Sequence, residues 1–150
     1  MPEIYCVDTG SLIKLNRDFP QDVFPGVWEN MDRLAASGRL EAPAEVLQEI
    51  ERGDDELVSW ARQHRGMFKR PDADQITAVQ EILAAFPSLV DASKETPDAD
   101  PFVVALAKAG NDLQASSLIP DRYVVVTEER RRGIPLACSR YGKAGHSALS

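Results

Sequence analysis

The sequence has few of the residues that bind zinc or form disulfides. It contains two cysteines, Cys6 and Cys138, and two histidines among 150 residues. The cysteines lie far apart in the chain and form no CxxC pair, which argues against a zinc site or a thiol redox motif. Both are flanked by apolar residues, so we expect two buried, reduced thiols.

Long apolar runs are also missing. No window approaches the roughly 20 apolar residues that a membrane-spanning helix needs. The opening residues, MPEIYCVDTG, do not show the basic region, apolar stretch and cleavage site of a secretory signal. We therefore expect no membrane association and a location in the cytoplasm.

Positive charge is the third scarce component. Lys and Arg number 17 against 24 Asp and Glu, which gives a net charge of -7. This balance argues against nucleic-acid binding over the whole surface but allows a local basic strip beside an acidic pocket. Length and composition are those of one globular domain over residues 1–150, with a loosely ordered tail from about residue 140.

Short apolar strands alternate with helices along the chain. Strands are expected at 3–7, 39–43, 123–127 and 134–138. Apolar residues at helical spacing predict helices from about residue 9 and over 26–38, 43–53, 54–64, 72–86 and 98–110. Asp54 is expected to cap the 54–64 helix, and Gly110 to end the last one. This alternation predicts an α/β fold with a mostly parallel central sheet flanked by helices.

Acidic residues follow strands or lie in the next helix in four separate segments. They are Asp8, Glu49, Asp98 with Asp100, and Glu128 with Glu129. Because active sites of parallel sheets form at the carboxyl ends of the strands, we expect these carboxylates to converge there. Converging carboxylates repel each other and need cations, and oxygen ligands without His or Cys suit Mg²⁺ or Mn²⁺. Such a site would support metal-assisted hydrolysis of phosphodiesters.

Each acid also has a purely structural interpretation. Asp8 and Asp100 could be N-caps of the helices that follow them. Glu49 could be a solvated helix residue paired with Arg52. The glutamates at 128–129 could form ion pairs in an exposed turn. Only the four segments taken together favour a metal site.

Four motifs, in the order in which they occur along the chain, resemble those of the PIN domain, the fold of VapC-type toxin ribonucleases. The motifs are YCVDTGSLI (5–13), APAEVLQEIERG (42–53), ADPFVVALA (99–107) and VVVTEE (124–129). The resemblance extends from about residue 3 to residue 138. It implies a three-layer PIN-like fold and an endoribonuclease that depends on Mg²⁺ or Mn²⁺ and acts as the toxin of a toxin–antitoxin pair.

The resemblance also implies four acids that ligate the metal and carry out catalysis. They are Asp8, Glu49, Asp100 and Glu129. Glu128 stays open as an alternative for the last position, and Asp98 for the third. The hydroxyls of Ser11 and Thr127 would orient the ligands. Ser11 takes this role because position 10 is glycine, where the family often has Ser or Asn.

An RNA substrate requires positive charge near the acidic site. The favoured contacts are Arg130, Arg131 and Arg132, directly after the last acids. A second candidate group consists of Arg62, Arg65, Lys69 and Arg70. Trp28 and Trp60 have apolar neighbours at helical spacing, so we expect them in the core and not stacked on bases. Two further possible partners are a cognate antitoxin protein and a second copy of the chain, which could form a homodimer through residues 22–37.

Two other functions compete with the nuclease. A catalytically silent PIN-like module would keep the acids as helix caps while it binds RNA or protein. A phosphatase of the haloacid dehalogenase type also has an Asp after its first strand, but it needs a second Asp two residues later, where this sequence has Gly10.

Overall fold

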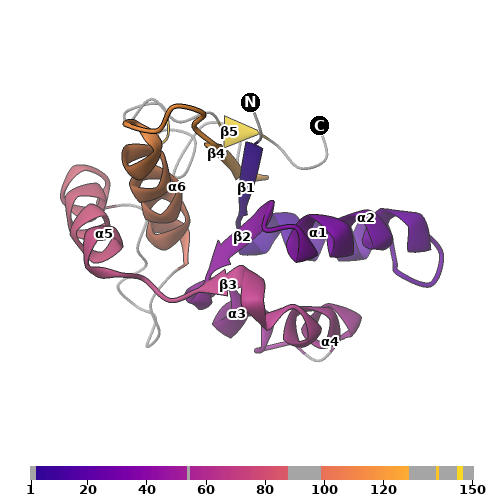
Figure 1. Cartoon of the computed structure of the whole chain (residues 1–150). Helices are drawn as coiled ribbons and strands as arrows, with labels where there is room; N and C mark the ends of the chain where they lie inside the picture. The colour runs from indigo at the N-terminus through magenta and orange to yellow at the C-terminus, as the bar shows by residue number, and fades with distance from the viewer. Residues whose placement is uncertain (1–2, 54, 88–98, 129–137, 139–144, 147–150) are drawn as a thin grey trace.

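The computed structural model describes residues 3–53, 55–87, 99–128, 138 and 145–146. The predicted α/β architecture is confirmed, because a parallel sheet lies between helices, consistent with a three-layer PIN-like fold (Figure 1). The strand order is β3-β2-β1-β4-β5, and every neighbouring pair is parallel. The strands are β1 (Glu3–Val7), β2 (Leu40–Pro43), β3 (Phe68–Lys69), β4 (Arg122–Val126) and β5 (Gly145–His146).

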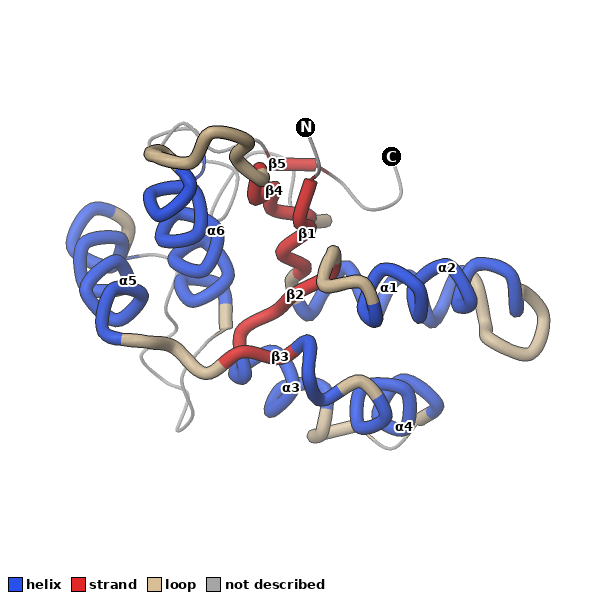
Figure 2. The backbone as a smooth tube through the Cα atoms, in the orientation of Figure 1, coloured by secondary structure: helices blue, strands red, loops and turns tan. Residues whose placement is uncertain are grey.

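Helices cover both faces of this sheet. The described helices are α1 (Thr9–Asp18), α2 (Pro25–Ala36), α3 (Ala44–Ile50), α4 (Glu56–Gln63), the short 3-10 helix η1 (Arg65–Met67), α5 (Ala73–Ala85) and α6 (Asp100–Gln114). In Figure 2, α5 and α6 lie on one side of the strands, and α1 and α2 on the other. None of the helices in the described ranges is long and apolar enough to cross a membrane.

The core forms where the apolar strands meet the apolar sides of the helices. The central strands β1 and β4 pair along their whole length, with Val7 level with Val126. Trp28 and Trp60 are buried and pack edge to face, with ring centroids 5.3 Å apart, so their predicted place in the core is confirmed. Cys6 and Cys138 are both buried and neither forms a disulfide, as expected.

Several boundaries differ from the prediction. The helix expected at 54–64 begins at Glu56, and its N-cap is Asp55, whose Oδ1 accepts a hydrogen bond from Leu57 N at 3.1 Å. The expected cap, Asp54, lies outside the described residues, as does the expected strand at 134–138 except for Cys138. Strand β3 is too short to have been predicted from periodicity, and β5 lies within the tail that we expected to be loose.

The predicted end of α6 at Gly110 is wrong, because the helix continues to Gln114. A Cβ atom at position 110 would lie 2.6 Å from ring atoms of Tyr123 in β4. Next to this contact, Asn111 Nδ2 donates to Tyr123 O at 3.0 Å, and Tyr123 N donates to Asn111 Oδ1 at 2.9 Å. The glycine is therefore used for close packing of a helix on a strand and not for a helix end.

This contact predicts the effect of Gly110→Ala. The added methyl must displace the Tyr123 ring, so we expect the free energy of unfolding to fall by about 1–3 kcal/mol. Gly26→Ala in α2 is the control, since its Cβ meets nothing within 4 Å and alanine favours the helix. Urea unfolding followed by tryptophan fluorescence measures both variants. Equal stability of the two would contradict the packing role of Gly110.

Candidate active site

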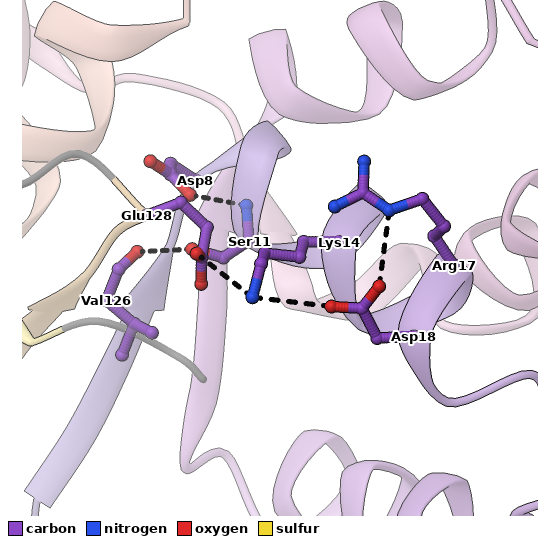
Figure 3. A network of polar contacts seen from close by, with 7 residues as sticks. All are labelled: Asp8, Ser11, Lys14, Arg17, Asp18, Val126 and Glu128. Carbon is purple, nitrogen blue, oxygen red and sulfur yellow. Dashed lines mark hydrogen bonds and ion pairs between the residues drawn. The ribbon is translucent and has the colours of Figure 1, made fainter. Parts of the chain in front are cut away.

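Asp8 is a nearly buried carboxylate at the carboxyl end of the central strand β1, with 4% of its surface exposed. Its Oδ1 accepts a hydrogen bond from Ser11 N at 2.8 Å, which caps α1 (Figure 3). Its Oδ2 accepts a hydrogen bond from Thr127 Oγ1 at 2.6 Å. The N-cap interpretation is therefore confirmed, and the same side chain also joins β1 to the residue after β4.

Ser11 and Thr127, the two predicted supporting residues, are both almost fully buried beside Asp8. Thr127 contacts Asp8 through its hydroxyl. Ser11 contacts Asp8 through its backbone N–H, while its hydroxyl donates to Val126 O at 3.3 Å (Figure 3). The hydroxyl of Ser11 therefore stabilises the position of α1 against β4 and does not bond Asp8.

Glu128 lies at the same edge, directly after Thr127, and is partly buried. Its Oε2 is 3.6 Å from Lys14 Nζ, and the same ammonium is 3.3 Å from Asp18 Oδ2 (Figure 3). Its Oε1 is buried and has no hydrogen-bond partner in the described part of the chain. The predicted fourth acid, Glu129, for which Glu128 is the alternative, lies outside the described residues, as does the run at 130–132.

Glu49 contacts the residue that precedes Asp100. Glu49 Oε1 accepts a hydrogen bond from Ala99 N at 2.7 Å, which ties α3 to the start of α6. Asp100 is the next residue and the first of α6. The N-cap is Ala99 and makes no side-chain cap, so Asp100 is not the cap that its position before Pro101 predicted. Asp98 lies outside the described ranges.

The structure therefore shows two contacts of the predicted acids: Asp8 with Thr127, which precedes Glu128, and Glu49 with Ala99, which precedes Asp100. Within the described ranges, no three His, Cys, Asp or Glu side chains gather closely enough to hold a metal ion. Since Glu129 and Asp98 fall outside those ranges, the convergence of all four acids on one cation remains a prediction.

Sequence reasoning missed three residues at this edge: Thr9, Lys14 and Glu45. Thr9 follows Asp8, and its buried Oγ1 has no partner among the residues described. Glu45 opens α3 directly after β2, the neighbour of β1, and its Oε2 is likewise buried and unpartnered. The only signal for Glu45 in the sequence is its place four residues before Glu49, on the same side of the helix.

The buried oxygens of Thr9, Glu45 and Glu128 bear on whether a divalent cation suits this edge of the sheet. Oxygen atoms of Thr9, Glu45 and Glu128 follow the ends of three adjacent strands and lack hydrogen-bond donors in the described structure. Each buried acceptor without a donor costs about 1–3 kcal/mol. Hydroxyl and carboxylate oxygens are the ligands that Mg²⁺ and Mn²⁺ take. The chemistry of these oxygens therefore suits a hard divalent cation.

The Thr127 contact predicts a loss of stability in Thr127→Val. The variant keeps the side-chain shape but leaves the buried Asp8 carboxylate without one donor, which costs about 1.5–3 kcal/mol of unfolding free energy. Thr77→Val on the exposed side of α5 is the matched control. Urea unfolding at neutral pH compares the two. A change at position 127 no larger than at position 77 would rule out this role.

Glu45 predicts a specific dependence of stability on pH. Burial raises the pKa of its carboxyl above the usual value for glutamate. The folded chain then binds the proton more tightly than the unfolded chain, so this contribution to stability is full at low pH and is lost as the pH rises through the raised pKa. Glu45→Gln cannot ionise, so its stability relative to the wild type should be higher at about pH 7 than at about pH 4.

Thermal unfolding at both pH values measures this difference for Glu45→Gln. Glu29→Gln, at an exposed position of α2, serves as the control and should follow the wild type at both. A Glu45→Gln curve parallel to the wild type would show that burial does not disfavour the charged form.

Comparison with known proteins shows which family the chain belongs to. No curated protein matches the chain. The model of a family described as "Domain of unknown function (DUF4411)" matches residues 5–142, which is most of the chain and includes the whole edge around Asp8. The chain belongs to this DUF4411 family.

Proposed function

We propose that the chain is a metal-dependent endoribonuclease that hydrolyses RNA phosphodiester bonds at the carboxyl edge of its sheet. The observation that carries this proposal is the nearly buried Asp8 with unpartnered buried oxygens of Thr9 and Glu128 next to it in the structure. In the described part of the chain, no hydrogen-bond donor contacts the buried oxygens of Thr9 and Glu128. A bound cation would give these oxygens a partner. Perturbed or unsatisfied polar groups of this kind are typical of functional sites.

The residues proposed to hold Mg²⁺ or Mn²⁺ come from four segments of the chain. They are Asp8, Glu49, Asp100 and Glu129, with Glu128 and Asp98 as alternatives. A bound cation would activate a water molecule and neutralise charge that develops on the phosphate. Thr127 and Ser11 N–H fix the orientation of Asp8, and Lys14 balances the charge of Glu128 while no cation is present.

The resemblance to PIN domains supports the choice of RNA and suggests the biological setting. The parallel strand order and the acids after β1, β2 and β4 are the arrangement that the resemblance implies. We extend the proposal to a toxin of a toxin–antitoxin pair that works in the cytoplasm, binds a cognate antitoxin protein and can form a homodimer. The exposed Val23 and Phe24 before α2 agree with an apolar contact there.

One observation favours the alternative, a catalytically silent module that binds RNA or protein. Both oxygens of Asp8 already accept hydrogen bonds from the chain, and Lys14 already pairs with Glu128. These contacts stabilise the fold without a metal. A single substitution distinguishes the two functions.

Asp8→Asn should abolish RNA cleavage while the chain still folds. We expect the wild type to cleave RNA with Mn²⁺ or Mg²⁺ and not with EDTA. The variant should lose more than about a hundredfold in rate, because loss of a direct metal ligand costs more than loss of a residue that only supports one. The assay uses a panel of single-stranded and structured RNAs and DNAs, with fold checked by circular dichroism. Asp22→Asn, at an exposed position before α2, is the control and should keep full activity.

The panel also identifies the substrate class. If the wild type cleaves DNA and no RNA, the enzyme is a deoxyribonuclease and not a ribonuclease. If the wild type and Asp8→Asn behave alike on every RNA and DNA, the nuclease proposal is wrong and the silent module remains.

A further inference from the structure

A cleft with a volume of about 310 Å³ lies apart from the Asp8 site, since none of the residues around Asp8 lines it. Its lining residues come from strands β2, β3 and β4 and from helices α5 and α6. Its apolar wall includes Leu106 and Leu113 of α6 and the ring of Tyr123. The exposed Lys69 and Arg70 lie at the end of β3, where the chain turns towards α5. The cleft thus combines an apolar wall with two positive charges in a protein of net charge -7.

An acid and a phenol lie in the same cleft. Burial raises the pKa of the Glu41 carboxyl, and the nearby Lys69 ammonium partly offsets this rise. Burial and then the charge of Glu41 raise the pKa of Tyr123. All three residues line the cleft, and Glu41 is close enough to both Lys69 and Tyr123 to interact with their charges, although the three come from different strands. The cleft can offer a hydrogen-bond acceptor, a flat ring and a cation to one small molecule.

Two contacts shape this cleft. Gly110 has no side chain, so the Tyr123 ring lies directly against α6 and forms a wall of the cleft. Asp72 also lines the cleft, but its Oδ1 accepts a hydrogen bond from Gln75 N at 2.8 Å and caps α5. The helix N-terminus is thereby satisfied within the chain. The attraction for an anion thus comes from Lys69 and Arg70.

We propose that this cleft binds one nucleotide whose base carries an exocyclic amine. Lys69 and Arg70 bind the phosphate, with Arg70 able to form paired hydrogen bonds to it. The base packs on Tyr123 and the leucines, and Glu41 accepts a hydrogen bond from the amine of adenine or cytosine. A cleft of this size falls at the lower end of small-molecule sites, which suits a single nucleotide. The nucleotide is either free or one residue of an RNA strand.

Calorimetric titration with 5′-AMP, 5′-UMP, adenosine and a short oligoadenylate tests this site. EDTA is present throughout, so metal-dependent cleavage does not interfere. We expect 5′-AMP to bind one site, with uridylate and adenosine weaker. Arg70→Ala should weaken 5′-AMP binding about tenfold, as expected for loss of a charged hydrogen bond. Arg33→Ala, an exposed arginine of α2, should leave it unchanged.

Glu41→Leu tests how the base is recognised. It should remove the preference for 5′-AMP over 5′-UMP while phosphate binding persists. Tighter binding of oligoadenylate than of 5′-AMP, weakened by Arg70→Ala, identifies the ligand as a residue of RNA. Equal or weaker binding of the oligomer identifies a free nucleotide.

Three results would overturn the proposal. They are no binding of 5′-AMP or oligoadenylate at millimolar concentration, equal affinity for 5′-AMP and 5′-UMP, and affinities that neither Arg70→Ala nor Glu41→Leu changes. Asp8→Asn should bind 5′-AMP like the wild type, so a failure of the nuclease proposal and a failure of this one give different results.

Discussion

The hydrogen bond from Thr127 to Asp8 is the contact on which the rest of the edge depends. It joins side chains 119 residues apart, one after β1 and one after β4. The Asp8 carboxylate is nearly buried, so its lost hydration must be replaced by donors within the chain. Thr127 supplies one donor and Ser11 N–H the other, and the same bonds fix β1, α1 and β4 relative to each other. The stability of this edge and the position of the Asp8 carboxylate thus depend on the same two hydrogen bonds.

Around this contact the chain leaves polar atoms unsatisfied where a packed protein normally pairs them. Thr9, Glu45 and Glu128 each keep a buried oxygen without a donor in the described ranges. In the described part of the chain, Lys14 brings a positive charge to Glu128, with its Nζ 3.6 Å from Glu128 Oε2. Well-folded sequences tend to break local rules of this kind at functional sites, where a ligand completes the set. The cleft beside Tyr123 differs from the Asp8 site, because charged side chains of both signs lie around its apolar wall.

Local patterns predicted much of the fold for a physical reason. β1 and β4 are short and apolar because both faces of the sheet are covered, and such runs are visible in the sequence. Caps are also local, since Asp8 and Asp72 bond N–H groups three residues later. The failure at Gly110 has the opposite cause, because a glycine inside a helix pattern looks like a stop unless the ring that packs on it is known.

The sequence by itself determined the positions of β1, β2 and β4 and of the main helices between them. It also determined the burial of Trp28 and Trp60 and an aspartate that follows the first strand and caps the next helix. Tertiary structure alone decided that β1 pairs with both β2 and β4 and that Val7 lies level with Val126. This register brings Thr127 to Asp8 and places Glu45 at the neighbouring strand end. Helices and caps depend on residues a few positions apart, whereas strand neighbours depend on how whole layers bury their apolar faces, which no short stretch of sequence encodes.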